Sequence, residues 1–241
     1  SNAIMVARGD LGVEIPPHRV PAVQKKIVKK AVERSRPVII ATQMLESMTY
    51  SPVATRAEVN DVANSVIDGA DAVMLSGETS VGKYPVKTVD TMRKIIRDIE
   101  KSDYVFKPVF NQGLDLWLPK DRQISNSICQ HASQLSEQTR ASAIICMTHS
   151  GYNAIKMSSL RPTSFVHVFT NNYSILNKLS LVWGVQAYYY DREATTDQTI
   201  IETKEILRIN KYIKKGDYII NLASMPAHEK GMTNMVKLSK V

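Results

Sequence analysis

Polar residues and glycine follow three apolar runs near the start of the chain, in types that suit the binding of an anion and a metal. The three groups are Ala7-Arg8-Gly9-Asp10, Ala41-Thr42-Gln43-Met44 and Leu75-Ser76-Gly77-Glu78. The Asp10 carboxylate suits a hard cation, since Mg²⁺ in proteins takes one or two carboxylates together with substrate oxygens. Gly9 has no Cβ, so an anionic group can approach its backbone N–H, and the Thr42 hydroxyl could donate to the same group. Any one group alone reads as an ordinary turn, but three at matching positions favour a site.

These groups can form one site only if they lie at the same edge of a β-sheet. The pattern of the first hundred residues predicts such a sheet. We predict strands at 4–7, 38–41 and 72–75, with helices over 20–31, 55–67 and 85–99. Thr55 and Glu58 form a capping box at the start of the second helix. Strands that are apolar throughout and separated by helices indicate a parallel sheet covered by helices.

The spacing of the three groups matches the size of a βα unit. Thr42 follows Asp10 by 32 residues and Ser76 follows Thr42 by 34. We therefore predict the last three βα units of a partial (β/α)8 barrel, whose active residues stand at the carboxyl ends of the strands. Three units cannot close a barrel, which leaves two open sheet edges and predicts self-association or a poorly ordered first segment.

The rest of the chain predicts a second α/β domain. Residues 101–120 contain Pro108, Gly113 and Pro119 without a clear period and are interpreted as a linker. The expected boundaries are a tag-cleavage remnant at 1–3, the partial barrel at 4–100, the linker at 101–120 and a mostly parallel α/β domain at 121–241. Its strands are expected at 143–146, 165–169, 185–188, 218–221 and 235–238, and its helices around 124–135, 151–160, 172–181 and 197–210. The first strand begins directly after the remnant, so we expect upstream sequence to have been lost.

Composition excludes several classes of protein. The 241 residues are 44% hydrophobic and 22% charged, as in an ordinary globular protein, and no apolar run or signal peptide indicates a membrane. The net charge of +8 is interpreted as the solvated face of one helix, formed by Lys25, Lys26, Lys29 and Lys30. No cluster of basic residues interleaves with aromatic ones, which argues against nucleic acid. Cys129 and Cys146 lack metal-binding spacing and are expected to be buried free thiols in the cytoplasm.

Long motifs in the first hundred residues resemble the pyruvate kinase family. They are the segments 4–14, 41–48 and 74–79, with Pro52, the Thr55–Glu58 box and Asp61-Val62-Ala63-Asn64 between them. The resemblance is strong over 4–100 and looser but continuous over the second domain. It implies a glycolytic phosphotransferase that converts phosphoenolpyruvate and ADP to pyruvate and ATP with Mg²⁺ and usually K⁺. Full-length members are usually tetramers, so a homo-oligomer is expected.

The resemblance also assigns roles to the three groups of residues. Asp10 matches a magnesium carboxylate that also touches the substrate, while Gly9 and Thr42 match the amide and the hydroxyl that bind the substrate carboxylate. The family's catalytic lysine, its second magnesium carboxylate, the K⁺ ligands and most ADP contacts lie upstream of this segment. We therefore expect no catalytic residue here and an inactive fragment, since one carboxylate rarely holds Mg²⁺ alone.

A second candidate site follows the strand at 143–146. A strand, a loop of small polar residues and a helix N-terminus form an anion site, because free N–H groups and the helix dipole point the same way. In the family this loop binds phosphorylated effectors, and a late segment folds over it. The implied residues are Thr148, Ser150, Gly151, Tyr152, Asn153, Gly231 and Thr233. Tyr152 stands where effector-activated members often carry Lys or Arg, which argues against fructose bisphosphate. A helix merely capped by Ser150 remains an equal interpretation.

Two other functions stay open beside the pyruvate kinase fragment. One is a stand-alone module, formed by the C-terminal domain, that binds a phosphorylated metabolite. The other is a Mg²⁺-dependent barrel enzyme of enolate chemistry, such as a lyase or aldolase acting on a keto acid. The unbroken stretch from Ala41 to Met48 argues against this last possibility.

Overall fold

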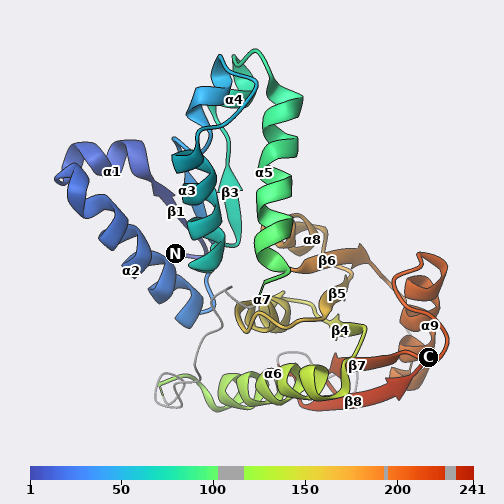
Figure 1. The fold of residues 1–241 in the computed structure, drawn as a ribbon. Coiled ribbons are helices and arrows are strands. Elements are labelled where there is room, and N and C mark those ends of the chain that lie inside the picture. Colours follow the sequence, from blue (N-terminus) through green and yellow to red (C-terminus); the bar gives the residue numbers. More distant parts are fainter. Residues whose placement is uncertain (103–116, 193–194, 226–231) are drawn as a thin grey trace. The chain divides into compact units, whose positions relative to one another are not determined.

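The chain forms two compact units, Ser1–Pro108 (unit 1) and Val109–Val241 (unit 2). The structure, a computed structural model, describes residues 1–102, 117–192, 195–225 and 232–241. Figure 1 shows both units, with most of their helices and strands labelled. The expected linker at 101–120 falls largely on 103–116, outside the described residues, so the domain boundaries stay a prediction.

Unit 1 contains a parallel sheet of three strands in the order β1-β2-β3. The strands are β1 (Ile4–Ala7), β2 (Val38–Ala41) and β3 (Ala72–Met74). Val38 and Ile40 are fully buried, as an apolar central strand with helices packed against it requires. The prediction of three parallel strands from an incomplete barrel is confirmed, and the described strands form no closed barrel.

The helices of unit 1 connect these strands and cover them. They are α1 (Arg8–Glu14), η1 (Pro17–Arg19), α2 (Val20–Glu33), η2 (Glu46–Thr49), α3 (Arg56–Ile67), α4 (Gly77–Ser80) and α5 (Pro85–Glu100). The predicted capping box of α3 is present in full, with the Thr55 and Glu58 side chains bonded to each other's backbone N–H. In Figure 1, α5 lies beside α3. Val28, Met48 and Met92 belong to the core that joins these helices to the sheet.

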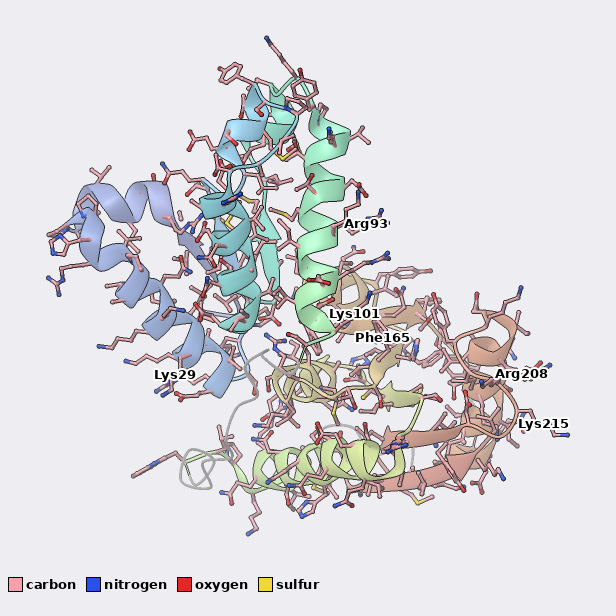
Figure 2. The ribbon with its side chains drawn as sticks, viewed as in Figure 1. Lys29, Arg93, Lys101, Phe165, Arg208 and Lys215 are labelled. Atoms are coloured by element: carbon pink, nitrogen blue, oxygen red, sulfur yellow. The ribbon has the colours of Figure 1, made fainter. Side chains whose placement is uncertain are left out.

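Two features of unit 1 differ from the sequence-based expectation. The turn predicted at Gly9 and Asp10 is the first turn of α1, a short helix with no buried residue and therefore no apolar period to reveal it. On α2 the buried residues are Gln24, Val28, Ala31 and Val32, while the apolar Val20, Val23 and Ile27, where burial would be expected, are only half-buried. The four lysines of α2 are exposed as predicted, and Figure 2 shows Lys29 pointing away from the helix.

Unit 2 contains a five-stranded sheet in the order β6-β5-β4-β7-β8. Its strands are β4 (Ala143–Met147), β5 (Phe165–Thr170), β6 (Val185–Tyr189), β7 (Tyr218–Ala223) and β8 (Met235–Lys240). Among these described strands, β8 pairs antiparallel with β7 and the other pairs are parallel. The predicted α/β domain with a mostly parallel sheet is thus confirmed, with each strand near its expected position.

Helices cover both faces of this sheet. They are α6 (Lys120–Thr139), α7 (Tyr152–Ser159), α8 (Tyr173–Leu179) and α9 (Thr196–Ile209). Alternate residues of β4 point to opposite faces, so Ile144 packs in the cluster that includes α6, α7 and α8, while Ile145 packs with Leu207 of α9. This layered arrangement puts the loop after β4 at the start of α7, where the sequence predicts a second site. No described helix is both long and apolar enough to cross a membrane.

Candidate functional site

The strand register of unit 1 brings the first two groups of candidate residues together. Ala7 pairs with Ala41, so the chain leaves β1 and β2 at one edge of the sheet. Across this edge the Gly9 backbone N–H donates a hydrogen bond to Thr42 Oγ1 at 2.9 Å. The hydroxyl in turn donates to the carbonyl of Ala41 at 2.7 Å. The two predicted donors to a substrate carboxylate therefore lie side by side, and an arriving anion that accepts from both would replace these two neutral hydrogen bonds by two charged ones.

Thr42 and the residue after it adopt an unusual backbone conformation. Their φ angles are 68° at Thr42 and 54° at Gln43, in the left-handed region that favours glycine. This conformation costs an L-residue roughly 1–2 kcal/mol, and here two residues in succession adopt it. Such a turn persists only where its surroundings fix it in place.

Arg8 is the main neighbour of the strained turn. Its Nη2 donates to the carbonyl of Thr42 at 2.7 Å and to that of Gln43 at 3.0 Å, and its Nε also reaches Thr42 O at 3.2 Å. Nη1 forms an ion pair with Asp61 of α3, at 2.7 Å from Oδ1 and 2.6 Å from Oδ2. The Arg8 side chain is 10% exposed and that of Asp61 is 34% exposed. The guanidinium thus joins the end of β1, the turn after β2 and helix α3.

Two glutamates also form hydrogen bonds with the segment that follows β2. Glu78 of α4 is buried and accepts hydrogen bonds from the backbone N–H of Leu45 at 3.2 Å and of Ser76 at 2.7 Å. Glu78, which belongs to the third group of candidate residues, thus ties the second strand end to the third from inside the unit. Glu58 accepts from the backbone and hydroxyl of Ser47, at 2.7 and 2.6 Å, in addition to its bonds to Thr55.

The electrostatics of Glu58 fit this supporting role. Partial burial would raise the pKa of the Glu58 carboxyl, but the hydrogen bonds from Ser47 and Thr55 outweigh it and hold the pKa below its usual value. Glu58 is therefore a stable carboxylate at neutral pH, and it accepts four hydrogen bonds that a protonated acid would accept less well.

Asp10 occupies the first turn of α1, and it is exposed. Among the described residues no three His, Cys, Asp or Glu side chains gather where they could hold a metal ion. A single exposed carboxylate fits Mg²⁺ that keeps its waters and takes its remaining ligands from a substrate. The described residues also contain no group of three carboxylates that could hold K⁺.

A cleft lies beside the Arg8–Asp61 pair. It has a volume of about 310 Å³ and is lined in part by Arg8, Gln43 and Asp61. Both members of the ion pair, and Gln43 of the strained turn, therefore form part of its wall.

The second candidate site lies in the loop between β4 and α7. The Gly151 N–H donates to Thr148 Oγ1 at 3.0 Å, and the Tyr152 N–H reaches Ser150 Oγ at 3.4 Å. Gly151 has a φ of 77°, and a Cβ placed on it would lie 2.9 Å from Ile175 Cγ2. Glycine is therefore required here by conformation and by space.

The side chain of Tyr152 turns towards α6. Its hydroxyl donates to Asn126 Oδ1 at 2.8 Å, and the guanidinium of Arg122 lies 3.8 Å from the centre of its ring. The Tyr152 ring thereby holds a cation beside the loop between β4 and α7.

Asn153 and Thr233 lie behind the loop, in contact with each other. The Asn153 amide donates to Met147 O at 2.9 Å and to Thr233 Oγ1 at 3.1 Å, and both residues are buried. Among the described residues, no donor lies within hydrogen-bond distance of Asn153 Oδ1, which is buried. Thr233 also donates its N–H to Ser125 Oγ at 3.0 Å. The expected late segment thus does reach the start of α7 at Thr233, while Gly231 lies outside the described residues.

Sequence reasoning missed the residues that hold the first site. Arg8 and Asp61 are 53 residues apart in the chain and meet only through the fold. The one local signal was the capping box, which located Glu58 but not its bonds to Ser47.

Comparison with known proteins identifies both units. Residues 1–89 match the family model described as pyruvate kinase, barrel domain, and residues 126–239 match that described as pyruvate kinase, alpha/beta domain. A pyruvate kinase of Clostridium acetobutylicum is 40% identical over all 241 residues, and one of Mycobacterium tuberculosis is 38% identical over the same length. The chain covers 50% of the first relative and 49% of the second.

A solved structure shows the same arrangement of elements. The crystal structure of a pyruvate kinase from Cryptosporidium parvum superimposes with a TM-score of 0.86 at 32% identity. The match covers 100% of this chain and 47% of that one. The chain therefore spans about half the length of these relatives.

Proposed function

Because this chain belongs to the pyruvate kinase family, we propose that it is part of an enzyme converting phosphoenolpyruvate and ADP to pyruvate and ATP. Within that enzyme it supplies the C-terminal part of the barrel domain and the α/β domain. The observation that carries the proposal is the hydrogen bond from the Gly9 N–H to the Thr42 hydroxyl, beside the exposed carboxylate of Asp10. The alternatives, a stand-alone effector module and an enolate-type lyase, have no comparable support.

The residues of unit 1 suit the binding of phosphoenolpyruvate and of Mg²⁺. Gly9 N–H and the Thr42 hydroxyl would bind the substrate carboxylate, and Asp10 would hold Mg²⁺, which neutralises charge on the transferring phosphoryl group. An oxygen of the ADP β-phosphate forms a bond to phosphorus while the bond to the enol oxygen breaks. The enolate then takes up a proton at carbon to give pyruvate. Fixed donors that place the carboxylate also place the phosphoryl group for this transfer.

The 241 residues alone should not catalyse the reaction. Asp10 is a single metal ligand, and the guanidinium of Arg8 is occupied by Asp61 and by backbone carbonyls. The lysine that stabilises the transferring charge, a second metal carboxylate, the K⁺ ligands and most ADP contacts would come from residues outside this chain.

The roles of Asp10 and Thr42 can be tested in the full-length enzyme by a coupled assay of pyruvate formation. Asp10→Asn should lower kcat roughly a hundredfold, as removal of one stabilising group at a reacting centre does. Thr42→Val should raise KM for phosphoenolpyruvate roughly tenfold, because one hydrogen bond to a charged group is lost. Asp98→Asn, on the exposed face of α5, is the control and should change neither constant.

Two results would contradict these assignments. Full kcat in the Asp10→Asn enzyme would remove the metal role. Pyruvate formation by the 241-residue chain above the blank, abolished by Asp10→Ala, would disprove that the chain alone is inactive.

We also propose that unit 2 binds a phosphorylated effector at the loop after β4. Its residues would be Thr148, Ser150, Gly151 and Tyr152, backed by Asn153 and Thr233 and with Gly231 nearby in the chain. Support comes from the left-handed Gly151 at the start of α7, the hydroxyls of the loop and the Arg122 cation against the Tyr152 ring. Thermal-shift titration with sugar phosphates and nucleoside monophosphates tests this, with Arg122→Gln as the variant. A melting temperature unchanged by every compound would remove the effector site.

Assembly and location complete the proposal. Among the described strands of unit 1, β1 and β3 each pair with β2 only, which leaves two edges for other chain segments or subunits to cover. We propose a homo-oligomer, to be checked by sedimentation of the full-length enzyme, with a monomer as the contradicting result.

Free, buried Cys129 and Cys146 suit the cytoplasm, where glycolytic enzymes act.

A further inference from the structure

Arg8 gives all its described hydrogen bonds to the protein itself. Four of them end on the turn after β2, at the carbonyls of Thr42 and Gln43 and at the sulfur of Met44, and two end on Asp61. Its side chain is 10% exposed. A guanidinium used in this way is not available as a cation for the substrate, so a role for Arg8 has to act through the groups that it holds.

The two carbonyls that Arg8 holds belong to Thr42 and Gln43, the residues in the unfavourable left-handed conformation. Carbonyls of consecutive left-handed residues point to one side of the chain, and a single planar fork of N–H donors can reach both. The compact ammonium of a lysine cannot bond two carbonyls and a bidentate carboxylate together. These hydrogen bonds therefore require an arginine, and a positive charge alone would not form them.

Asp61 fixes the direction of this fork. Both its oxygens accept from Nη1 of Arg8, which leaves Nη2 and Nε facing the turn. Asp61 belongs to α3, whose N-terminal capping box also bonds to Ser47 in the same loop. The turn is thus held at both ends by one helix, through Arg8 at Thr42 and Gln43 and through Glu58 at Ser47.

We propose that Arg8, oriented by Asp61, is a positioning residue that keeps Thr42 and Gln43 left-handed. It thereby directs the Thr42 hydroxyl to the Gly9 N–H, where the substrate carboxylate binds. The inference rests on the proposed function for the identity of the substrate, and the conformation of the turn is its independent part.

Steady-state kinetics of the full-length enzyme separate positioning from general stability. Arg8→Lys should raise KM for phosphoenolpyruvate about tenfold and leave kcat within about twofold, since binding is lost equally in ground and transition states. A merely structural defect would lower the active fraction, and so kcat, at unchanged KM. The matched control is Arg93→Lys, which changes an exposed arginine paired with Asp90 on α5 and should alter neither constant (Figure 2). An unchanged KM in Arg8→Lys would overturn the proposal, and so would an equal rise in Arg93→Lys.

Relief of the backbone strain should rescue the variant. Glycine adopts a positive φ freely, so Gln43→Gly added to Arg8→Lys should lower KM again by about threefold. No recovery in the double variant would show that the left-handed turn is not what Arg8 maintains.

A spectroscopic test keeps this inference apart from the proposed function. If the wild-type enzyme forms no pyruvate, the proposed function fails. The backbone carbon chemical shifts and φ-dependent couplings of Thr42 and Gln43, measured by NMR, still decide whether Arg8 keeps this turn left-handed. They should report left-handed residues in the wild type and in Arg93→Lys, and a shift of both residues away from that region in Arg8→Lys. A left-handed turn that persists in Arg8→Lys would overturn the positioning role whatever the enzyme catalyses.

Discussion

The turn after β2 and the loop after β4 are both candidate anion sites at the carboxyl end of a parallel strand, yet they are held in different ways. The turn after β2 rests on basic and acidic side chains, namely Arg8, Glu58 and Glu78. The loop after β4 has its backbone N–H groups bonded to the neutral hydroxyls of Thr148 and Ser150, the second at 3.4 Å. Hydrogen bonds to charged groups are roughly twice as strong as neutral ones, so we expect the turn after β2 to be held more firmly than the loop after β4.

The two sites also treat left-handed backbone differently. The turn after β2 places a threonine and a glutamine there, which stores strain, while the loop after β4 uses Gly151, which does not. A site that must present a threonine hydroxyl cannot replace that threonine by glycine. Unit 1 therefore accepts a strained residue and stabilises it with charges, whereas unit 2 keeps an unstrained loop that can adapt to a ligand.

The contrast extends to the titratable groups of each unit. In unit 1 hydrogen bonds lower the pKa of Glu58 despite its partial burial and keep it ionised. In the core of unit 2 burial lowers the pKa of His167 to about 4 and raises that of Cys129 to about 12, so both stay neutral. Acid should therefore weaken the two units at different pH values.

The largest expected effect is the acid sensitivity of unit 2. His167 takes up a proton in the unfolded chain near pH 6.5 but in the folded protein only near 4. Between these values the unfolded state binds more protons, so stability is full above pH 6.5 and falls as the pH drops to 4. The loss should reach about 3 kcal/mol at pH 4. Hydrogen exchange of β4 amides between pH 7 and 4, corrected for intrinsic rates, measures it.

Variants of two histidines sharpen this test. His167 Nδ1 lies 3.0 Å from the Tyr188 hydroxyl, and His167→Gln retains an acceptor for it while removing the titration. The variant should be less stable at pH 7 but lose little more on acidification. His149→Gln, which changes an exposed histidine, should keep the wild-type pH profile. An unchanged profile in His167→Gln would show that other groups cause the acid sensitivity.

The next effect concerns the charged support of unit 1. Glu58→Gln replaces a carboxylate that accepts four hydrogen bonds by an amide with one acceptor oxygen and two donors. Unit 1 should lose about 2 kcal/mol, read from hydrogen exchange at the buried amides of Met44 and Leu45. Amides of β4 in unit 2 serve as the internal reference. A loss no larger than that of Glu46→Gln, at an exposed position in the same loop, would contradict the importance of charge for this turn.

The same division between local and distant interactions explains what the sequence could predict. The strands followed from apolar runs, and the Thr55–Glu58 box followed from a spacing of three residues; both are local patterns and both are confirmed. Helix α1 buries no residue, so it had no period to find. The family resemblance named Gly9, Asp10 and Thr42 but could not reveal how they are held.

The support of the site depends on contacts between distant segments. Arg8 and Asp61 meet across 53 residues, and Leu45 and Glu78 across 33. Nothing in the residues next to Thr42 indicates its positive φ, because that angle is imposed by donors from another strand end. Strain and its compensation are tertiary properties, and a single sequence carries no direct sign of them.

A smaller effect should follow from changing the left-handed residue of unit 2. In Gly151→Ala the new Cβ meets Ile175 Cγ2 at 2.9 Å in a backbone conformation that alanine disfavours. Unit 2 should lose about 1–2 kcal/mol, measured by hydrogen exchange of β4 amides. Gln43→Ala is the counterpart in unit 1, where the position already holds an L-residue, and it should cost less. Equal losses in the two variants would contradict the distinction between a strained and an unstrained loop.

The smallest expected effect on stability separates folding from binding at Gly9. A Cβ on Gly9 would lie 3.7 Å from Thr42 Oγ1, an ordinary contact, and alanine favours the helical conformation of α1. Gly9→Ala should therefore stabilise unit 1 by up to about 1 kcal/mol. The same methyl group occupies the approach to the Gly9 N–H, so KM for phosphoenolpyruvate should rise in the full-length enzyme. Gly12→Ala, where an added Cβ meets nothing within 4 Å, should give a similar gain in melting temperature without the change in KM. If Gly9→Ala left KM unchanged, the substrate carboxylate would not approach this amide, and the strained turn would serve some other ligand.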